Sequence, residues 1–212
     1  MDKRFAITLG VIIIGFIGLV AYSKMSASPE VESTGSNNIF GKLDSKVTLT
    51  EFVDFQCEAC YGFYPTVKEI KEKYKDRVKF QVKYFPITSG HANALAAAAT
   101  AQAAAKQDKF WEMHNLLFER QKSWENNSPT TRDEVFAQYA EEIGLDMDKF
   151  RVDIASDETQ SVIKADLAEV KRLGGDGTPT FALNGKKIAN PKNTVDAISK
   201  VLDDELAKAN QN

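Results

Sequence analysis

The sequence predicts an α/β domain in which a parallel pair of strands is followed by a helical segment and then by a return to strands. Residues 47–55 and 78–84 alternate with the period of two that is typical of strands. Residues 60–74, between them, have the apolar spacing of an amphipathic helix. A strand, a helix and a strand in succession predict a parallel pair. A further strand pattern, at residues 180–188, follows a long helix-rich stretch.

Composition limits the classes of function. The chain has 212 residues, of which 43% are hydrophobic and 27% charged, as is typical of a protein that folds around one core. The net charge is −3, and the sequence contains no block of lysines that could bind phosphate groups. We therefore expect a monomer with one compact domain and no nucleic acid partner.

Residues 5–22 form an apolar stretch whose only ionisable group is a terminal tyrosine. Eighteen helical residues span about 27 Å, which is close to the thickness of a membrane's hydrocarbon core. A cleaved secretory signal, with a weak cleavage site at residues 26–28, is the alternative, but its apolar region is usually shorter. We predict one uncleaved transmembrane helix. Lys3 and Arg4 should keep residues 1–4 in the cytoplasm, which places the rest of the chain outside the cell membrane.

Residues 23–38 are rich in serine, proline, glutamate, glycine and asparagine, and they contain almost no large apolar side chain. This composition is typical of a flexible linker between an anchor and a domain. We therefore expect the folded domain to cover residues 39–212.

The chain has two cysteines, Cys57 and Cys60, with Glu58 and Ala59 between them. Because the pair opens the predicted helix, the unpaired backbone N–H groups and the helix dipole should stabilise a thiolate at Cys57. Cys60 lies one turn further along, on the apolar side of the helix, and should be shielded. We predict that Cys57 is the attacking cysteine and Cys60 the resolving cysteine.

Two other roles for the cysteine pair stay open. A structural disulfide here would close a very small loop, and the chain-entropy model gives it less than about 2 kcal/mol. A zinc site needs four ligands, and only His91 and His114 remain as nitrogen donors. We expect both histidines to be structural. We also expect no metal and no cofactor beyond a redox-active Cys57–Cys60 disulfide.

Glu51 interrupts the apolar face of the first predicted strand. The other residues on this face are Val47, Leu49, Val53 and Phe55. A buried charge is costly unless it is paired, and burial raises the pKa of a carboxyl group. We therefore predict that Glu51 accepts the proton that Cys60 must lose. The alternative is a twisted strand from which Glu51 reaches solvent.

The later elements follow from composition and periodicity. Helical patterns cover residues 92–105, 109–120, 131–143, 148–154 and 158–173, and the first of these contains ten alanines. Residues 180–183 and 186–188 should form a hairpin, because Asn184-Gly185 is a dipeptide that type I′ turns prefer. An amphipathic helix over residues 194–209 closes the chain.

Four motifs carry a family resemblance: Glu-Phe-Val-Asp-Phe-Gln-Cys at 51–57, Pro65, Lys-Phe-Trp-Glu-Met-His at 109–114, and Gly-Thr-Pro-Thr-Phe at 177–181. With these motifs, residues 40–206 resemble the DsbA family of thioredoxin-like disulfide-bond proteins. The resemblance implies a thioredoxin-like fold with a helical domain inserted at about residues 87–155. It also implies a cis peptide bond between Thr178 and Pro179 that faces the cysteines.

The resemblance further implies roles for individual residues. Thr178 and Pro179 are expected to bind an extended substrate segment through the backbone, whereas a plain turn proline is the alternative. Glu51 matches the position of the family's buried acid. Many oxidising members of the family carry proline and histidine between the cysteines, so we expect Glu58 and Ala59 to tune the redox strength here.

Together these features predict an extracytoplasmic thiol-disulfide oxidoreductase at the cell membrane. It would introduce disulfides into reduced secreted or surface proteins, and a membrane partner linked to quinones would reoxidise it. A reductase or isomerase with a reduced pair is the alternative of the same class, and the lack of a visible dimerisation domain weakens the isomerase more. A binding module with an inert disulfide is the alternative of another class.

Overall fold

The structure is a computed structural model that describes residues 33–211. The predicted cytoplasmic residues 1–4, the predicted transmembrane helix at 5–22 and most of the predicted linker lie outside the described residues. Between residues 33 and 211, no helix is both long enough and apolar enough to cross a membrane.

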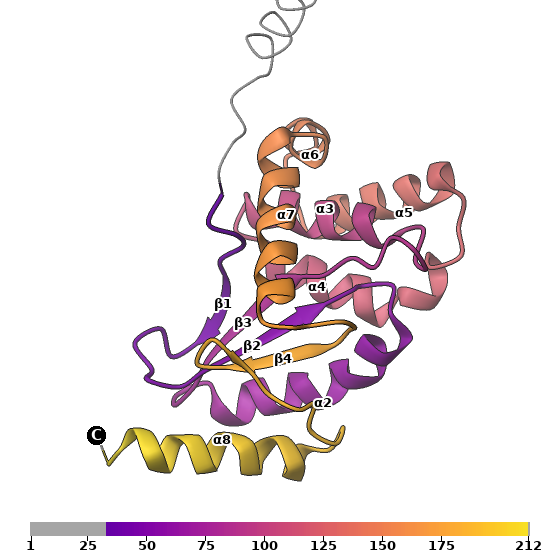
Figure 1. Cartoon of the computed structure of the whole chain (residues 1–212). Coiled ribbons are helices and arrows are strands. Elements are labelled where there is room, and N and C mark those ends of the chain that lie inside the picture. The colour runs from indigo at the N-terminus through magenta and orange to yellow at the C-terminus, as the bar shows by residue number, and fades with distance from the viewer. Residues whose placement is uncertain (1–32, 212) are drawn as a thin grey trace, which may run out of the picture. The chain divides into compact units, whose positions relative to one another are not determined.

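A mixed sheet of five strands forms the centre of the domain (Figure 1). The strands are β1 (Asn38–Gly41), β2 (Thr48–Val53), β3 (Lys79–Tyr84), β4 (Thr180–Leu183) and β5 (Lys186–Lys187), in the spatial order β1-β3-β2-β4-β5. Strands β2 and β3 are parallel, which confirms the prediction. Strand β2 is central, because it also pairs with β4 in the antiparallel direction. Strand β1 was not predicted, since its four residues are too few to display an alternating pattern.

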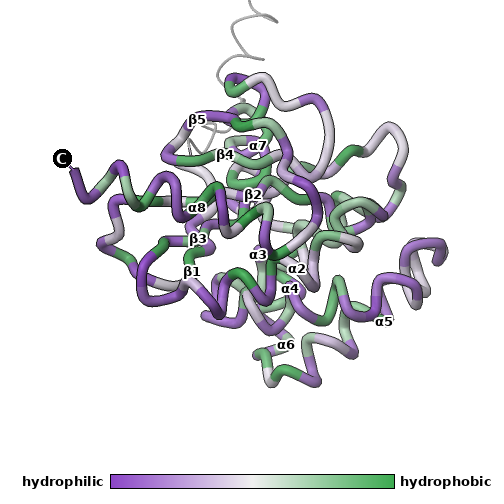
Figure 2. The backbone as a smooth tube through the Cα atoms, turned by 90° about the horizontal axis from the view of Figure 1, so that it is seen from below, coloured by the Kyte–Doolittle hydropathy of each residue, from purple (hydrophilic) through white to green (hydrophobic). Residues whose placement is uncertain are grey.

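Helices cover both faces of this sheet (Figure 1). Helices α2 (Glu58–Tyr74) and α8 (Val195–Ala209) pack on the face that carries Leu49, Phe80 and Phe181. Helix α7 (Asp157–Arg172) packs on the opposite face, where Val170 contacts Phe52. The alternation of hydrophobic and hydrophilic residues along α8 is visible in Figure 2 and is expected of a helix with one buried face.

The predicted helical insertion is confirmed. It consists of helices α3 (Ala94–Ala105), α4 (Phe110–Glu119), α5 (Pro129–Glu142) and α6 (Met147–Ile154), with a short 3₁₀ helix at Gln121–Ser123. Most alanines of α3 are buried, because their small side chains let the neighbouring helices approach closely. The insertion contacts the end of the sheet where β2 and β3 finish, since Val53, Val82 and Tyr84 belong to the same apolar cluster as its helices.

The predicted hairpin is also confirmed. Asn184 and Gly185 join β4 to β5, and both have positive φ angles, 50° and 74°. A type I′ turn needs positive φ at both central residues, and asparagine and glycine tolerate it best. The turn chemistry visible in the sequence therefore determines the local backbone.

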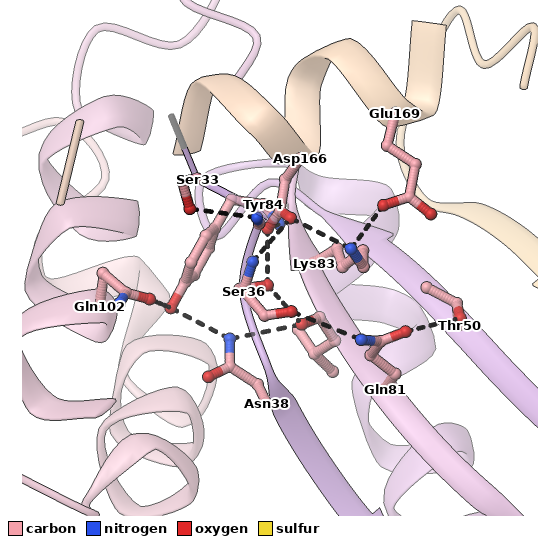
Figure 3. Close-up of polar contacts among 12 residues, drawn as sticks. Ser33, Ser36, Asn38, Thr50, Gln81, Lys83, Tyr84, Gln102, Asp166 and Glu169 are labelled. Carbon is pink, nitrogen blue, oxygen red and sulfur yellow. Dashed lines mark hydrogen bonds and ion pairs between the residues drawn. The ribbon is translucent and has the colours of Figure 1, made fainter. Parts of the chain in front are cut away.

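Residues 33–38 correct the predicted domain boundary, because part of this segment is built into the domain. Ser36 and Asn38 are each only 5% exposed. The Ser36 N–H and hydroxyl both donate to Asp166 on α7, at 2.9 and 2.6 Å (Figure 3). The Asn38 amide donates to the Tyr84 hydroxyl at 3.1 Å. Composition indicated a linker here because these residues are polar, whereas their partners are distant in sequence.

Asp166 is the centre of this polar cluster, and its side chain is fully buried. Its carboxylate also accepts a hydrogen bond from the Tyr84 N–H at 2.9 Å. Lys83 forms an ion pair with it and a second one with Glu169 (Figure 3). The donors are needed because burial raises the pKa of the Asp166 carboxyl and the hydrogen bonds oppose that shift.

Candidate active site

The two cysteines lie where β2 ends and α2 begins. Cys57 is the N-cap of α2, and its N–H donates to the Asp54 carbonyl at 3.1 Å. Both residues are free thiols in this structure, with Cys57 half-buried and Cys60 buried. The predicted position of the pair, at the amino terminus of a helix and after a strand, is confirmed.

The environment of Cys57 favours its thiolate. The pKa of this thiol is lowered to about 5, mainly because the Cys60 side chain donates a hydrogen bond to it. Partial burial opposes this shift, whereas the Thr178 side chain and the backbone N–H groups of Cys60 and Ala59 add to it. Cys57 is therefore ionised at neutral pH and is a ready nucleophile.

The environment of Cys60 has the opposite effect. Only 1% of this residue is exposed, and burial is the main reason why the pKa of its thiol is raised well above the usual value. The hydrogen bond and the charge of Cys57, followed by the charge of Glu51, raise it further. Cys60 thus keeps its proton at neutral pH, and it needs a base before it can react.

The loop before β4 faces the cysteines, as the sequence resemblance implied. The peptide bond between Thr178 and Pro179 is cis. The Thr178 carbonyl oxygen lies 3.5 Å from the Cys57 Sγ and can accept a hydrogen bond from it while Cys57 is a protonated thiol. The Thr178 hydroxyl is buried and has no hydrogen-bond partner among the described residues. When Cys57 is ionised, the Thr178 side chain helps to stabilise the thiolate and lowers the pKa of Cys57.

Glu51 is buried on β2, and the alternative in which it reaches solvent is wrong. Only 7% of the residue is exposed, because helices α2 and α4 cover the face of the sheet from which its side chain projects. Burial raises the pKa of its carboxyl to about 7, although the charge of Lys71 opposes the shift. Glu51 and Cys60 line the same small cavity, about 20 Å³ in volume, which is large enough for one water molecule.

Asp54 anchors the cysteine loop, and the sequence analysis did not single it out. Its fully buried carboxylate accepts the Gln56 N–H and the Ile87 N–H, each at 2.8 Å. It also pairs with the His91 Nδ1 at 2.7 Å. Asp54 therefore connects the loop before Cys57 to the first residues of the helical insertion. Its position three residues before Cys57 was the only available signal.

Gln121, in the 3₁₀ helix of the insertion, holds the same loop from the other side. Its side-chain amide donates to the carbonyl groups of Phe55 and Cys57, at 2.8 and 3.2 Å. The residue is fully buried. No pattern in the sequence indicates this role, because Gln121 is more than sixty positions from the loop.

The remaining candidate residues from the sequence are His114, the possible metal ligands, and Glu58 and Ala59. His114 is buried among aromatic rings, and burial lowers its pKa to about 3, so it stays neutral. No group of three or more potential metal ligands occurs in the described part of the chain. Glu58 and Ala59 are exposed beside Cys57. Lys71, on α2, extends its ammonium group to 3.3 Å from the centre of the Trp111 ring.

An ionised thiol at a helix end, a buried partner thiol and a cis-proline loop against them make up the redox site of a thioredoxin-type protein. Residues 33–204 match the protein family described as Thioredoxin, and the chain belongs to that family. The resemblance to its DsbA-like members is confirmed by similar structures. BdbD of Bacillus subtilis has a TM-score of 0.68 and 25% identity, covering 85% of this chain and 100% of its own. The α-DsbA1 protein of Wolbachia pipientis, at 21% identity and a TM-score of 0.70, shows the same fold over 84% of this chain and 95% of its own.

Two kinds of relatives are similar in sequence. Probable disulfide bond formation protein D of Bacillus cereus is 29% identical over 210 residues, which cover 95% of both chains. The Na⁺/H⁺ antiporter NhaA 3 of Salinispora tropica is 34% identical over 178 residues, which cover 82% of this chain and 25% of the relative. The chain thus spans about a quarter of the length of the antiporter relatives that it matches.

Proposed function

We propose that this protein is a thiol-disulfide oxidoreductase that donates its Cys57–Cys60 disulfide to reduced secreted or surface proteins. The contrast between the two thiols carries the proposal, since Cys57 is ionised and half-buried while Cys60 is protonated and buried. Stabilising the thiolate stabilises the reduced protein, and a stabilised reduced form makes the disulfide a stronger oxidant.

The chemistry proceeds by two exchanges. A client thiolate attacks the Sγ of Cys57, the Cys57–Cys60 bond breaks, and Cys60 leaves as a thiolate that takes a proton from Glu51. A second client thiolate then attacks the client sulfur of the mixed disulfide and releases Cys57 as its stabilised thiolate. The client loses two electrons and gains a disulfide, while the protein becomes the dithiol. A membrane partner linked to quinones would then reoxidise the pair.

Thr178 and Pro179 are the proposed binding site for the client backbone. A surface depression of about 430 Å³ is lined by both residues and by Lys187 and Asn190. Asn190 donates a hydrogen bond to the Pro179 carbonyl at 2.7 Å, which holds this loop in place. An extended client segment could add to the edge of the loop while its cysteine is bonded to Cys57.

Trapping mixed disulfides tests the proposal. In Cys60→Ala, Cys57 can still attack but cannot be released, so covalent complexes with client proteins should accumulate on non-reducing gels. Cys57→Ala is the matched control and should trap none. Equal trapping by both variants would show that the assigned roles are wrong. The redox state of the pair in cells separates the alternatives of the same class, because a donor is held oxidised and a reductase or isomerase is held reduced.

Glu51 is the proposed proton acceptor and donor for Cys60. Glu51→Gln keeps the size of the side chain but removes its basicity, so turnover should fall by up to ~100-fold. Turnover measured across pH checks this, and an unchanged profile would exclude the role.

The location is proposed from the sequence alone. Residues 5–22 would form a single membrane span with residues 1–4 in the cytoplasm, and the redox domain would act as a monomer outside the membrane. Protease added to intact cells without a cell wall should digest the domain. Protection of the domain in that experiment would show that the proposed orientation is wrong.

A further inference from the structure

We propose that Lys71 is a positioning residue that keeps Glu51 in its carboxylate form and thereby controls the loss of the Cys60 proton. The proposal rests on the proposed function, because it concerns the step in which Cys60 reacts. It adds a residue of helix α2 to the site, one that does not contact the reacting sulfur atoms.

The position of Lys71 on α2 directs it toward the interior. It follows Cys60, Tyr64 and Val67 at spacings of four, three and four residues, so all four lie on one stripe of the helix. The three preceding members of this stripe are buried. The Lys71 ammonium lies 3.3 Å from the centre of the Trp111 ring and 4.7 Å from that of Phe40. These aromatic faces hold the cation in place.

Lys71, Glu51 and Cys60 line one cavity between α2, β2 and α4. The strands that flank Glu51 contribute no charge there, because its register partners are Val82 and Phe181. Because these strand partners carry no positive charge, a counter-ion for the Glu51 carboxylate must come from the helices that line the cavity.

The other titratable groups that line the cavity do not meet this need. His114 on α4 is neutral, since burial lowers its pKa to about 3. Lys68 has a side chain that is 53% exposed, and it pairs with Glu119 at 2.8 Å. The Tyr64 hydroxyl donates to the same Glu119 at 2.7 Å. Among the described residues that line this cavity, Lys71 is thus the cation whose charge acts on Glu51.

The charge of Lys71 favours the ionised form of Glu51, and the charge of Glu51 favours the ionised form of Lys71. Burial lowers the pKa of Lys71 to about 7, and the charge of Glu51 opposes that shift. Burial raises the pKa of Glu51, and the charge of Lys71 opposes that shift in turn. Without the cation, burial of Glu51 would be unopposed, so its pKa would rise further. A smaller fraction of the protein would then carry a carboxylate able to accept the Cys60 proton.

The loss of the Cys60 proton can be measured separately when the Cys57–Cys60 disulfide forms from a mixed disulfide. The Cys57 thiolate attacks glutathione disulfide, forming a mixed disulfide and releasing one glutathione thiolate. Cys60 then gives its proton to the Glu51 carboxylate, its sulfur attacks the Sγ of Cys57, and a second glutathione thiolate leaves. The protein loses two electrons and the glutathione disulfide gains them. The second phase is first order, and it requires Glu51 to be ionised.

The experiment mixes the reduced full chain with excess glutathione disulfide and follows the first-order phase between pH 5 and 9. For the natural sequence, the rate should rise with pH through a midpoint set by Glu51. In Lys71→Met, the midpoint should move up by about one pH unit, which lowers the rate about fivefold at pH 7 and about tenfold at pH 6. Lys71→Gln is the second variant, in case the methionine impairs folding. Lys71→Arg restores the positive charge and should restore the midpoint.

Lys68→Met is the matched control, because Lys68 lines the same cavity but holds its charge in solvent; its midpoint should stay unchanged. An unshifted midpoint in both Lys71→Met and Lys71→Gln, an equal shift in Lys68→Met, or no rescue by Lys71→Arg would overturn the proposal. A natural chain that forms no mixed disulfide at Cys57 would instead overturn the proposed function. The two failures are therefore distinguishable.

Discussion

Cys57 and Cys60 are three residues apart in sequence, yet the pKa of the first thiol is lowered and that of the second is raised. The reason is their placement on the helix. Cys57 caps the first turn, where N–H groups and the Cys60 thiol can donate to it, whereas Cys60 points into the apolar cluster between α2 and the insertion. One helical turn is sufficient to separate a reactive thiolate from a shielded thiol.

The lowered pKa of Cys57 predicts how stability depends on pH. A thiol whose folded-state pKa is lowered contributes stability that is lost as pH falls through the folded value, here about 5. The reduced protein should therefore be more stable than the oxidised protein near pH 7, and this difference should shrink between pH 7 and 4. Thermal unfolding of both forms measures it. Cys57→Ala cannot form the disulfide, so it is scanned as a single form, and its stability should lack the pH-dependent component of the reduced natural chain. A difference between the reduced and oxidised natural chain that stays constant with pH would contradict the low pKa.

Glu58 has a separate expected effect on the redox potential. It is exposed and next in sequence to Cys57, so its charge should disfavour the thiolate weakly and be screened by salt. Glu58→Ala should lower the pKa of Cys57 and raise the reduction potential by about 10 to 30 mV. Equilibration with glutathione at low salt measures this change, with the same equilibration at high salt as the control. A potential that becomes more reducing would show that Glu58 does not act on the sulfur.

At the scale of elements, the cysteine loop is held by residues of the helical insertion. Asp54 connects the loop to Ile87 and His91, and Gln121 binds two of its carbonyl groups. A loop attached on both sides keeps Cys57 close to Thr178. The insertion therefore contributes directly to the geometry of the redox site, in addition to covering the end of the sheet.

Gln121→Leu tests this attachment. The substitution leaves the buried carbonyl groups of Phe55 and Cys57 without their donor, so the free energy of unfolding should fall by about 1–3 kcal/mol. Denaturant unfolding measures the loss. Gln160→Leu, on helix α7, is the matched control, because the described contacts of Gln160 are those of its backbone. If both variants lose the same stability, Gln121 does not hold the loop through its amide.

At the scale of the whole molecule, the domain begins earlier than its composition indicates. The segment containing Ser36 and Asn38 is attached to α7 and β3 through Asp166, Val82 and Tyr84. These contacts join the first described residues to elements near the middle and the end of the chain.

Two truncations test where the domain begins. A chain that starts at Ser33 should unfold with the same midpoint as the full chain. A chain that starts at Ile39 lacks the two Ser36 donors to Asp166 and should be less stable by several kcal/mol, because a buried carboxylate loses two of its hydrogen bonds. Thermal or denaturant unfolding compares them, and equal stability of the two truncated chains would restore the boundary at residue 39.

Local patterns in the sequence are sufficient to predict the order and type of most elements. Period-two alternation predicted β2 and β3, helical spacing predicted α2 to α8, and Asn184-Gly185 predicted the hairpin, because these signals depend on residues close together in the chain. The same local logic placed Cys57 at a helix end and marked Glu51 as a charge on an apolar face. Both positions are as predicted in the structure.

Which distant residues meet at the site depends on how the elements pack against one another. Lys71 is part of the Glu51 cavity because Trp111, on another helix, covers its ammonium group. The attachment of Ser36 to Asp166 and of Gln121 to the Cys57 carbonyl likewise joins residues far apart in sequence. Hydrogen bonds and burial at such positions depend on how the elements pack. The residues next to these positions in the chain therefore do not predict them.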